Sequence, residues 1–495
     1  MSVREEHELA SRRQKLELWR QLGFSLYPAN FKRSHSASQV ATLAEKSVSV
    51  LEGSEIPPGD EVSVAGRIMT VRPHGRLWFA TLEDQTGKIQ LGAIEETADK
   101  KMWQLLQAID RGDIVGAEGV VVKTKRGEPT VFLTKLVPLA KALQPLPEKW
   151  HGLQDIEERF RKRYLDILMN PEIKELLIKK TKFWDTARTF MKEHGFLEIE
   201  TPTLEVTTGG AEATPFKTYN EDFKLSLFLR ISVGELWQKR LMAAGFPKTF
   251  EIGRTFRNEG TDANHLQEFT NLEFYWAYAN YEDGMKLVEE LYKKIAMDVF
   301  GKTKFETRGH KFDLGGKWKR IDYREIIKKE TGIDVLQTTE KEIKNKLEEL
   351  KIVYDGDTME RLVDTLWKHC RKQISGPVFL TGHPKLVSPL SKSMEKNPEL
   401  TERFQIIIAG AEVGNGFSEL NDPIDQAERF EMQQKLLKAG DKEAMMPDKE
   451  FVEMLEYGMP PTCGFGFGEL LFAFLADKPL RETQFFPLMK PKNLE

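Results

Sequence analysis

The chain has 495 residues, of which 40% are hydrophobic and 30% are charged. This length exceeds what one ordinary core accommodates, so we expect two or more domains. No run of about 18 apolar residues is present and the first residues are charged, so we expect neither a membrane span nor a secretory leader. The formal net charge of −4 argues against a nucleic-acid binder that acts through overall charge, but not against an RNA enzyme with a local basic stripe.

Cysteine usage points to the compartment. The sequence has two cysteines, Cys370 and Cys463, far apart in the chain. Isolated thiols of this kind are typical of a reducing compartment and argue against a structural metal site. We therefore expect a cytoplasmic protein.

The first part of the chain predicts a helical extension over residues 1–60. Apolar Leu9, Leu16, Trp19 and Leu22 recur at helical spacing within residues 3–22. Several basic residues accompany them, and the pattern leaves open whether they contact phosphates or form a solvated face. These residues are Arg4, Arg12, Arg13, Lys15, Arg20, Lys32 and Arg33.

A small barrel is predicted over residues 61–143. Five short β-branched runs, at 62–72, 77–84, 88–94, 113–124 and 129–140, are separated by turn residues. Five such strands indicate an OB-fold, and the helical run KKMWQLLQAI falls between the third and fourth, where this fold commonly has a helix. A linker with Pro and Gly, residues 144–154, follows.

The remainder, residues 155–495, predicts an α+β domain. An amphipathic helix over residues 173–194 ends at Gly195, and FLEIETPTL then predicts a strand that ends at Pro202. Residues 322–375 predict a helical insertion. The fold we expect is therefore α+β: an N-terminal OB-fold β-barrel followed by a domain with an antiparallel sheet and flanking helices.

The strongest local signal is KTFEIGRTFRNEGTDANHLQEFTNLEFYWAYANY, which predicts two strands joined by a polar loop. Strand alternation puts the apolar residues Phe250, Ile252, Phe256, Leu272, Phe274, Trp276 and Tyr278 toward a core. The opposite face has Arg257, Phe269, Asn271, Glu273 and Tyr275. An arginine can clamp a phosphate, a phenylalanine can stack on a purine, and a carboxylate can pair with an ammonium group. Alternation alone leaves a solvated hairpin with incidental charges equally open.

Several motifs in this order resemble those of class II lysyl-tRNA synthetases of the bacterial type. FRNEG, His265 and EFTNLEFYWAY resemble motif 2, HGFLEIETPTL resembles motif 1 with Pro202 as its proline, and MPPTCGFGFGELLFAFL resembles motif 3. HGLQDIEERFRKRYLD, LRISVGELWQKRL and AEVGNGFSELNDPIDQAERF are also similar to segments of that family. The resemblance covers nearly the whole chain.

The resemblance implies a lysine–tRNA ligase that uses ATP as a substrate and Mg²⁺ as a cofactor. Its partners would be lysine, ATP and tRNA(Lys), and motif 1 would form a homodimer. Arg257 would be catalytic at the α-phosphate, and ATP would be bound by Arg257, Glu259, His265 and Phe269. Lysine would be bound by Gly210, Ala211, Glu235, Glu273, Tyr275, Asn415 and Glu419, with Gly209 in the same loop. Glu412 would hold Mg²⁺, and the anticodon would be bound by Arg67, Phe79 and Gln90, with Glu128 as a further candidate.

This chemistry requires no nucleophilic side chain. Adenylate formation is an in-line displacement at phosphorus, so positioning and charge stabilisation suffice. An aspartyl or asparaginyl enzyme shares the architecture but would need a cationic group to bind its substrate side chain. Glu273 and Glu419 favour lysine instead.

Two positions depart from the family pattern. Motif 3 normally ends in an acidic residue followed by Arg, whereas Glu469 is followed by Leu470 and Leu471. Gln405 stands where a second metal-binding carboxylate is usual. The alternative is therefore a catalytically impaired synthetase-like protein that binds tRNA or lysine. A paralogue that lysylates a protein is disfavoured, because the predicted barrel is of the anticodon-binding type.

Overall fold

The computed structural model describes residues 3–46, 58–124, 126–147, 155–211, 213–354, 356–441 and 444–492. Most of the predicted linker, residues 148–154, lies outside the described residues, and so does the side chain of Arg4. The chain forms two compact units, Met1–Ile156 and Glu157–Glu495. In the described ranges, no helix combines the length and apolar character that crossing a membrane requires.

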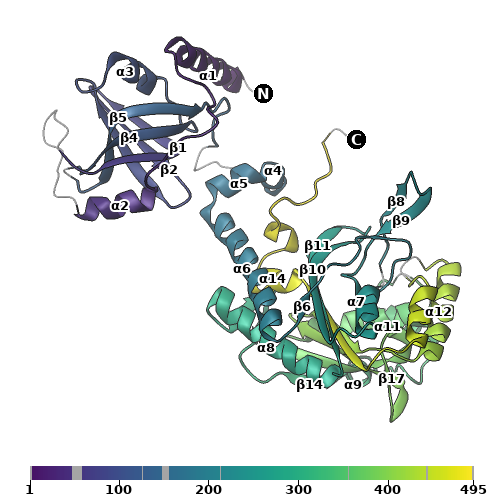
Figure 1. Cartoon of the computed structure of the whole chain (residues 1–495). Helices are drawn as coiled ribbons and strands as arrows, with labels where there is room; N and C mark the ends of the chain where they lie inside the picture. Colours follow the sequence, from purple (N-terminus) through teal and green to yellow (C-terminus); the bar gives the residue numbers. More distant parts are fainter. Residues whose placement is uncertain are drawn as a thin grey trace. The chain divides into compact units, whose positions relative to one another are not determined.

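The described strands of the first unit close into a five-stranded barrel in the order β1-β2-β3-β5-β4 (Figure 1). They are β1 (Glu61–His74), β2 (Leu77–Glu83), β3 (Lys88–Ile94), β4 (Ile114–Lys123) and β5 (Pro129–Ala140). β3 and β5 pair in parallel, and the other neighbours are antiparallel. Helix α3 (Lys100–Gln107) lies between β3 and β4 in sequence. This confirms the predicted OB-fold.

Alternation along the strands builds the barrel core. In β2, Trp78, Ala80 and Leu82 are buried while Phe79 and Thr81 between them are partly exposed. Successive side chains of a strand point to opposite faces, so the first set fills the barrel and the second lies outside it. Phe79 is therefore available on the outer surface.

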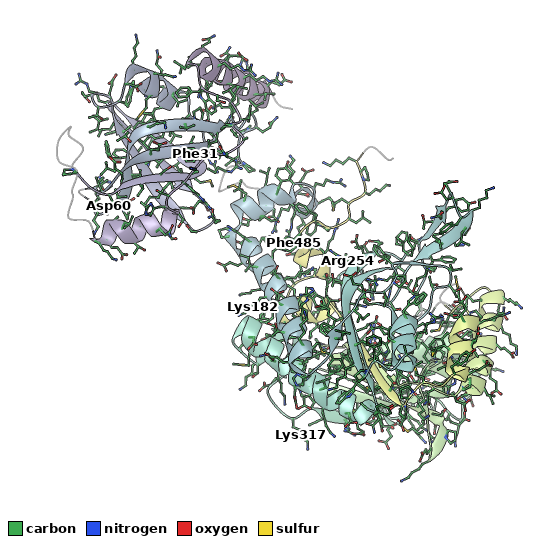
Figure 2. All side chains as sticks on the ribbon, viewed as in Figure 1. Phe31, Asp60, Lys182, Arg254, Lys317 and Phe485 are labelled. Atoms are coloured by element: carbon green, nitrogen blue, oxygen red, sulfur yellow. The ribbon has the colours of Figure 1, made fainter. Side chains whose placement is uncertain are left out.

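Helices α1 (Val3–Gln21) and α2 (Ala37–Lys46) pack on the barrel, with Trp19 in the same hydrophobic core. The Arg12 guanidinium donates to the carbonyls of Arg111 and Ala142 at 3.1 and 2.8 Å. Lys15 pairs with Asp110 at 2.5 Å. These two basic residues thus hold α1 against the barrel. Phe31, labelled in Figure 2, fills the space beside β4 that a side chain at Gly116 would occupy.

The second unit is built on a nine-stranded sheet, counted over the described residues, in the order β14-β15-β17-β18-β19-β11-β10-β6, with β16 paired to β17. The strands from β15 to β10 pair antiparallel, as predicted, while the edge pairs β14–β15 and β10–β6 are parallel, so the sheet is mixed. The bounds are β6 (Leu197–Glu198), β10 (Lys248–Phe256), β11 (Glu268–Ala277), β14 (Lys319–Asp322), β15 (Val378–Pro384), β16 (Ser393–Met394), β17 (Asn397–Ile408), β18 (Ala411–Ser418) and β19 (Thr462–Gly468).

One face of this sheet is covered by α6 (Pro171–Glu193) and α8 (Tyr281–Phe300), and the main core lies between these helices and the sheet. Phe274, Phe404, Phe465 and Phe467 extend from the strands into it. Because the apolar residues of each strand are used on this side, the opposite side of the same strands presents polar groups. The candidate site lies there.

The remaining elements surround the sheet (Figure 1). The predicted helical segment 322–375 contains α9 (Tyr323–Thr331), α10 (Glu340–Glu349) and α11 (Met359–Cys370), which share a core with Leu380 and Ile407, and then η1 (Arg371–Gln373). The others are α4 (Ile156–Arg161), α5 (Arg163–Met169), α7 (Glu235–Ala243), α12 (Pro423–Lys438), α13 (Lys449–Glu456), α14 (Leu470–Leu475), η2 (Lys385–Val387), η3 (Leu480–Thr483), β7 (Leu204–Glu205), β8 (Lys217–Asn220), β9 (Leu225–Leu229), β12 (Lys304–Thr307) and β13 (His310–Asp313).

Two local predictions were wrong. The strand expected over FLEIETPTL is reduced to the short β6 and, beyond Pro202, the separate β7, because the N–H of Thr201 donates to the Glu251 side chain and not to a neighbouring strand. Tyr278 does not join the core: β11 ends at Ala277, and Tyr278 has a φ of 64° and is 81% exposed. Its N–H donates to the carbonyl of Pro461, so the chain leaves the ladder one residue before the predicted end.

Candidate active site

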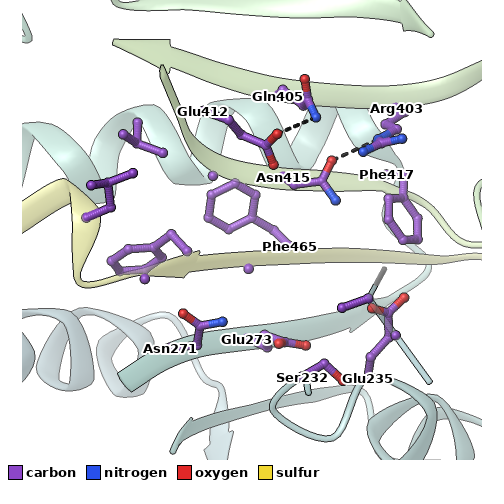
Figure 3. Close-up of a pocket in the computed structure, with 18 of the residues that line it drawn as sticks. Ser232, Glu235, Asn271, Glu273, Arg403, Gln405, Glu412, Asn415, Phe417 and Phe465 are labelled. Carbon is purple, nitrogen blue, oxygen red and sulfur yellow. Dashed lines mark hydrogen bonds between the residues drawn. The ribbon is translucent and has the colours of Figure 1, made fainter. Parts of the chain in front are cut away.

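A cavity of about 550 Å³ opens on the polar face of the sheet, and Figure 3 shows part of it. All residues that the resemblance assigns to ATP, lysine and Mg²⁺ line this cavity, although they come from segments more than 200 residues apart. They are Gly210, Ala211, Glu235, Arg257, Glu259, His265, Phe269, Glu273, Tyr275, Glu412, Asn415 and Glu419. Gly209 does not line the cavity itself, but its carbonyl accepts a hydrogen bond from the hydroxyl of Ser232, which does.

Strand β11 supplies the alternation that the sequence predicted. Phe269, Asn271, Glu273 and Tyr275 line the cavity, whereas Leu272 and Phe274 between them lie in the core. On β10, Phe250 lies in that core as predicted. Arg257, just after β10, turns to the cavity. The hairpin is therefore a wall of the cavity and not a solvated surface feature.

One end of the cavity is lined by carboxylates. Glu235, Glu273 and Glu419 are 6%, 7% and 1% exposed. Glu235 starts helix α7, Glu273 lies in the middle of β11, and Glu419 follows β18. The N–H of Val233 donates to Glu273 at 2.7 Å, and the Tyr275 hydroxyl lies 3.5 Å from the same carboxylate.

Lys239 is an internal counter-ion to this group that the sequence analysis did not identify. Its Nζ lies 2.8 Å from Glu235 Oε1 and 2.6 Å from Glu419 Oε2, and the residue is 1% exposed. Burial of an ion requires such pairing. The one signal in the sequence was the i,i+4 spacing from Glu235 to Lys239, which also occurs on ordinary solvated helices.

The carboxylate end has a deficit of positive charge. Burial, reinforced by the negative charge of Glu235, raises the pKa of Glu273 to about 8. Burial also raises the pKa of Glu419 to about 8, even though Lys239 acts in the opposite direction. Carboxylates that resist ionisation in an empty cavity become favourable partners once a cation enters. This end is therefore suited to a cationic ligand.

Two glycines leave the space that this end requires. Gly210 has a φ of 87°, and a Cβ there would lie 2.6 Å from the Cβ of Glu235. On β19, a Cβ at Gly464 would lie 2.0 Å from Glu419 Oε1 and 2.7 Å from the Tyr275 ring. A side chain at either position would displace the carboxylates.

The other end of the cavity has groups suited to a nucleotide. The guanidinium of Arg257 lies over the Phe269 ring, 5.3 Å from its centroid. Glu259 is held by the N–H of Thr214 at 3.4 Å, and His265 pairs with Asp262 at 2.8 Å. The guanidinium can bind a phosphate, and the aromatic ring beside it can stack on a purine of the same nucleotide.

Glu412 also lines the cavity, and its carboxylate accepts from the Gln405 amide at 2.6 Å (Figure 3). Gln405 Oε1 is buried and has no hydrogen-bond partner in the described part of the chain. No cluster of three or more His, Cys, Asp or Glu side chains in those ranges is arranged to hold a metal alone. Mg²⁺ usually takes one or two protein oxygens and completes its shell with water and substrate phosphates. Glu412 and the Gln405 oxygen fit such an ion.

Asn415 lies on β18, directly opposite Gln405 of the neighbouring strand β17. Its side-chain oxygen accepts from Arg403 Nε at 2.9 Å (Figure 3). Arg403 also donates to the Val387 carbonyl at 2.6 Å. The arginine thereby fixes the amide so that its NH₂ group faces the cavity side.

The motif 3 departure is visible in the structure. Leu470 begins α14, lines the cavity and packs partly on the core, while Leu471 is fully buried. Glu469 pairs with Lys180 of α6 at 2.8 Å. Its carboxylate also accepts from the N–H of Thr270 on β11. The acidic residue therefore ties α14 to α6, and Leu470 leaves an apolar patch where the resemblance implies a cation.

The predicted anticodon residues lie on the barrel. Phe79 faces outward beside Arg72, its partner on β1, and Arg72 donates to Gln90 at 3.0 Å. Arg67 lies on β1, five residues before Arg72 and opposite Glu83 of β2, and donates to the carbonyl of Gly112 at 2.7 Å. Phe79 and Gln90 are thus brought together with Arg72, which the sequence analysis missed, and Arg67 is not part of that group.

Comparison with known proteins identifies the family. A family model described as tRNA synthetases class II (D, K and N) matches residues 155–490, and one described as an OB-fold nucleic acid binding domain matches residues 62–139.

Curated relatives align over nearly the whole chain. A lysine–tRNA ligase of Thermotoga maritima is 40% identical over 479 residues, which are 96% of this chain and 94% of that protein. Lysine–tRNA ligases of a Roseiflexus species and of Halalkalibacterium halodurans are 42% and 41% identical over 486 and 491 residues, covering 97% and 98% of this chain and 98% and 97% of those proteins. The chain therefore belongs to the class II tRNA synthetases of the D, K and N group.

Proposed function

We propose that this chain is a lysine–tRNA ligase, which activates lysine with ATP and transfers it to tRNA(Lys). The observation that carries the proposal is the carboxylate end of the cavity, where Glu235, Glu273 and Glu419 lie buried in the same cavity as Arg257 and Phe269. The names of the relatives support it. An aspartate or asparagine side chain would bring an anionic or neutral group against these carboxylates, which is unfavourable.

In the first step, a carboxylate oxygen of lysine attacks the α-phosphorus of ATP and the bond to pyrophosphate breaks. Arg257 binds the α-phosphate and stabilises the charge that develops on it, while Phe269 stacks on adenine. Glu259 and His265 contact ATP. Because no covalent enzyme intermediate forms, the rate depends on how well these groups are positioned beforehand.

The lysine ligand is held by its two cations. Glu235, with the backbone of Gly210 and Ala211, binds the α-ammonium group, and Glu273, Tyr275 and Glu419 bind the ε-ammonium group. Asn415 orients the amino acid. Mg²⁺, held by Glu412 with the oxygen of Gln405, would neutralise phosphate charge when bound. In the second step a hydroxyl of the terminal ribose of the tRNA attacks the lysyl carbonyl carbon of the adenylate, and AMP leaves.

Lysine binding should depend on pH. Burial raises the pKa of both Glu273 and Glu419 to about 8, so these carboxylates take up protons as the pH falls from 8 to 6. A bound ammonium favours the ionised carboxylates, so binding releases protons, and the affinity for lysine should rise from pH 6 to pH 8. The expected slope is about tenfold per pH unit for each proton released. Calorimetry in two buffers of different ionisation enthalpy counts the protons. A constant or falling affinity over this range would contradict the assignment.

The OB-fold barrel would bind the anticodon with Phe79, Gln90 and Arg67. Base–aromatic stacking contributes about 1–3 kcal/mol per base. Phe79→Ala should therefore raise the KM for tRNA(Lys) in aminoacylation and leave ATP–pyrophosphate exchange unchanged. Phe79→Tyr keeps a ring and is the matched control, which should retain most of the aminoacylation. A loss of both activities in Phe79→Ala would indicate a role in folding instead.

The proposal includes the cytoplasm as the location and a homodimer formed through motif 1. It is tested by incubating the protein with ATP, Mg²⁺, tRNA(Lys) and labelled amino acid. Lysine should become attached to the tRNA, and aspartate and asparagine should not. Light scattering during chromatography gives the mass, and a monomer would contradict the dimer alone.

A further inference from the structure

The helical segment 322–375 contributes a wall to the cavity. Side chains of α11 and of the residue after it recur along one helical face, and these line the same cavity as Arg257 and Glu412. They are Glu360, Arg361, Asp364, Trp367, Lys368 and Arg371. Their spacing of one, three and four residues matches a single face of a helix. The wall brings cationic groups to a site that lacks an arginine at Leu470.

Most cations on this wall have anionic partners within the protein. Arg361 donates to Asp441 through two nitrogens, each at 2.9 Å. Lys368 pairs with Asp364 at 2.6 Å. The Arg371 guanidinium, in contrast, makes no hydrogen bond or ion pair with any other residue that the structure describes. It follows the C-terminal end of α11, where the partial negative charge of the helix favours a cation.

Arg371 lines the same cavity as Glu412, the candidate Mg²⁺ ligand. Arg403 already uses its nitrogens on Asn415 and the Val387 carbonyl. Among the basic side chains of this wall, Arg371 is the one whose charge is not paired with a carboxylate in the described part of the chain.

We propose that Arg371 binds the β- and γ-phosphates of ATP and so takes over part of the role of the arginine that is missing after Glu469. The inference deepens the proposed function, because it assumes that the nucleotide in this cavity is ATP. A guanidinium that makes no hydrogen bond or ion pair with the described residues, in the same cavity as a carboxylate that would share a phosphate-bound Mg²⁺, is suited to a polyphosphate. Leu470 lines the same cavity, so both positions have access to one ligand.

The test compares three ligands of the full-length protein by calorimetry in the presence of Mg²⁺: ATP, inorganic pyrophosphate and AMP. Arg371→Ala should weaken ATP and pyrophosphate binding by about 10- to 100-fold, the range of a charge-assisted hydrogen bond, and leave AMP binding unchanged. Arg371→Lys should recover part of the loss. Lys372→Ala, an exposed neighbour that does not line the cavity, is the matched control and should behave like the parent chain.

A second pair of variants tests whether Arg371 takes over the role of the arginine that motif 3 lacks at position 470. If Arg371 and an arginine at position 470 serve the same phosphates, Leu470→Arg should improve ATP affinity more in the Arg371→Ala background than in the parent chain. Equal gains in both backgrounds would overturn the shared role, and so would equal losses of ATP and AMP binding in Arg371→Ala. Failure of the proposed function gives a different result. The parent chain would bind ATP, and Arg371→Ala would weaken that binding, but the parent would show no ATP–pyrophosphate exchange with lysine.

Discussion

Replacing Glu273 by glutamine should raise the KM for lysine by about 150- to 5000-fold and leave the KM for ATP unchanged. Glu273 is buried, and the ε-ammonium of lysine would be desolvated against it. Removing one partner of a buried charge pair costs about 3–5 kcal/mol, which corresponds to a loss of this size. Steady-state pyrophosphate exchange at varied lysine and ATP measures both constants.

The control for Glu273→Gln lies on the same strand. Glu268 starts β11, is exposed, and lies 3.6 Å from Arg254 as an ion pair outside the lysine pocket. Glu268→Gln carries out the same chemical change and should leave the lysine KM unaltered, because an exposed ion pair contributes little. If Glu273→Gln also leaves the lysine KM unaltered, the carboxylate end does not bind lysine.

The second large effect is expected from Leu470→Arg, which should raise kcat/KM for ATP by a factor between ten and several thousand. An arginine here would cover adenine and reach the γ-phosphate. A cation–π contact contributes about 0.5–2 kcal/mol and a charge-assisted hydrogen bond about 1.5–3 kcal/mol. Leu470 lines the cavity, whereas Leu471 is fully buried, so position 470 can accept a charge and position 471 cannot.

If Arg371 already binds the phosphates, the increase in kcat/KM for ATP in Leu470→Arg should lie in the lower part of that range. Leu470→Met changes the side chain without adding charge and serves as the control. A charge-bearing variant that folds, as judged by its melting transition, and has the kcat/KM of the parent would show that Leu470 does not limit the use of ATP.

Much of the architecture follows from local patterns in the sequence. The five strands of the barrel were predicted within a few residues, because β-branched runs separated by turn residues leave little choice of boundary. On β11 the alternation of Phe269 to Tyr275 predicted which side chains line the cavity. In both cases the information lies between neighbours in sequence, where the period of a strand decides the outcome.

What the sequence could not predict depends on contacts between distant segments. The pairing of Lys239 with Glu419 joins residues 180 positions apart, and Lys239 by itself resembles any lysine on a helix. Arg12 was expected to be exposed or near phosphate, yet it donates to the carbonyls of Arg111 and Ala142, 99 and 130 positions along the chain. Helix α11 was seen as an insertion, and its cavity-facing side became apparent only from the fold.

ATP–pyrophosphate exchange with each amino acid in turn tests the central claim most directly. It isolates adenylate formation from tRNA binding, so it examines the cavity alone. We expect exchange with lysine, and none above background with aspartate, asparagine or neutral amino acids. We further expect Leu470→Arg to increase the exchange with lysine. Absence of exchange with lysine in both the parent chain and Leu470→Arg would contradict the ligase assignment and favour a non-catalytic protein that binds lysine or tRNA.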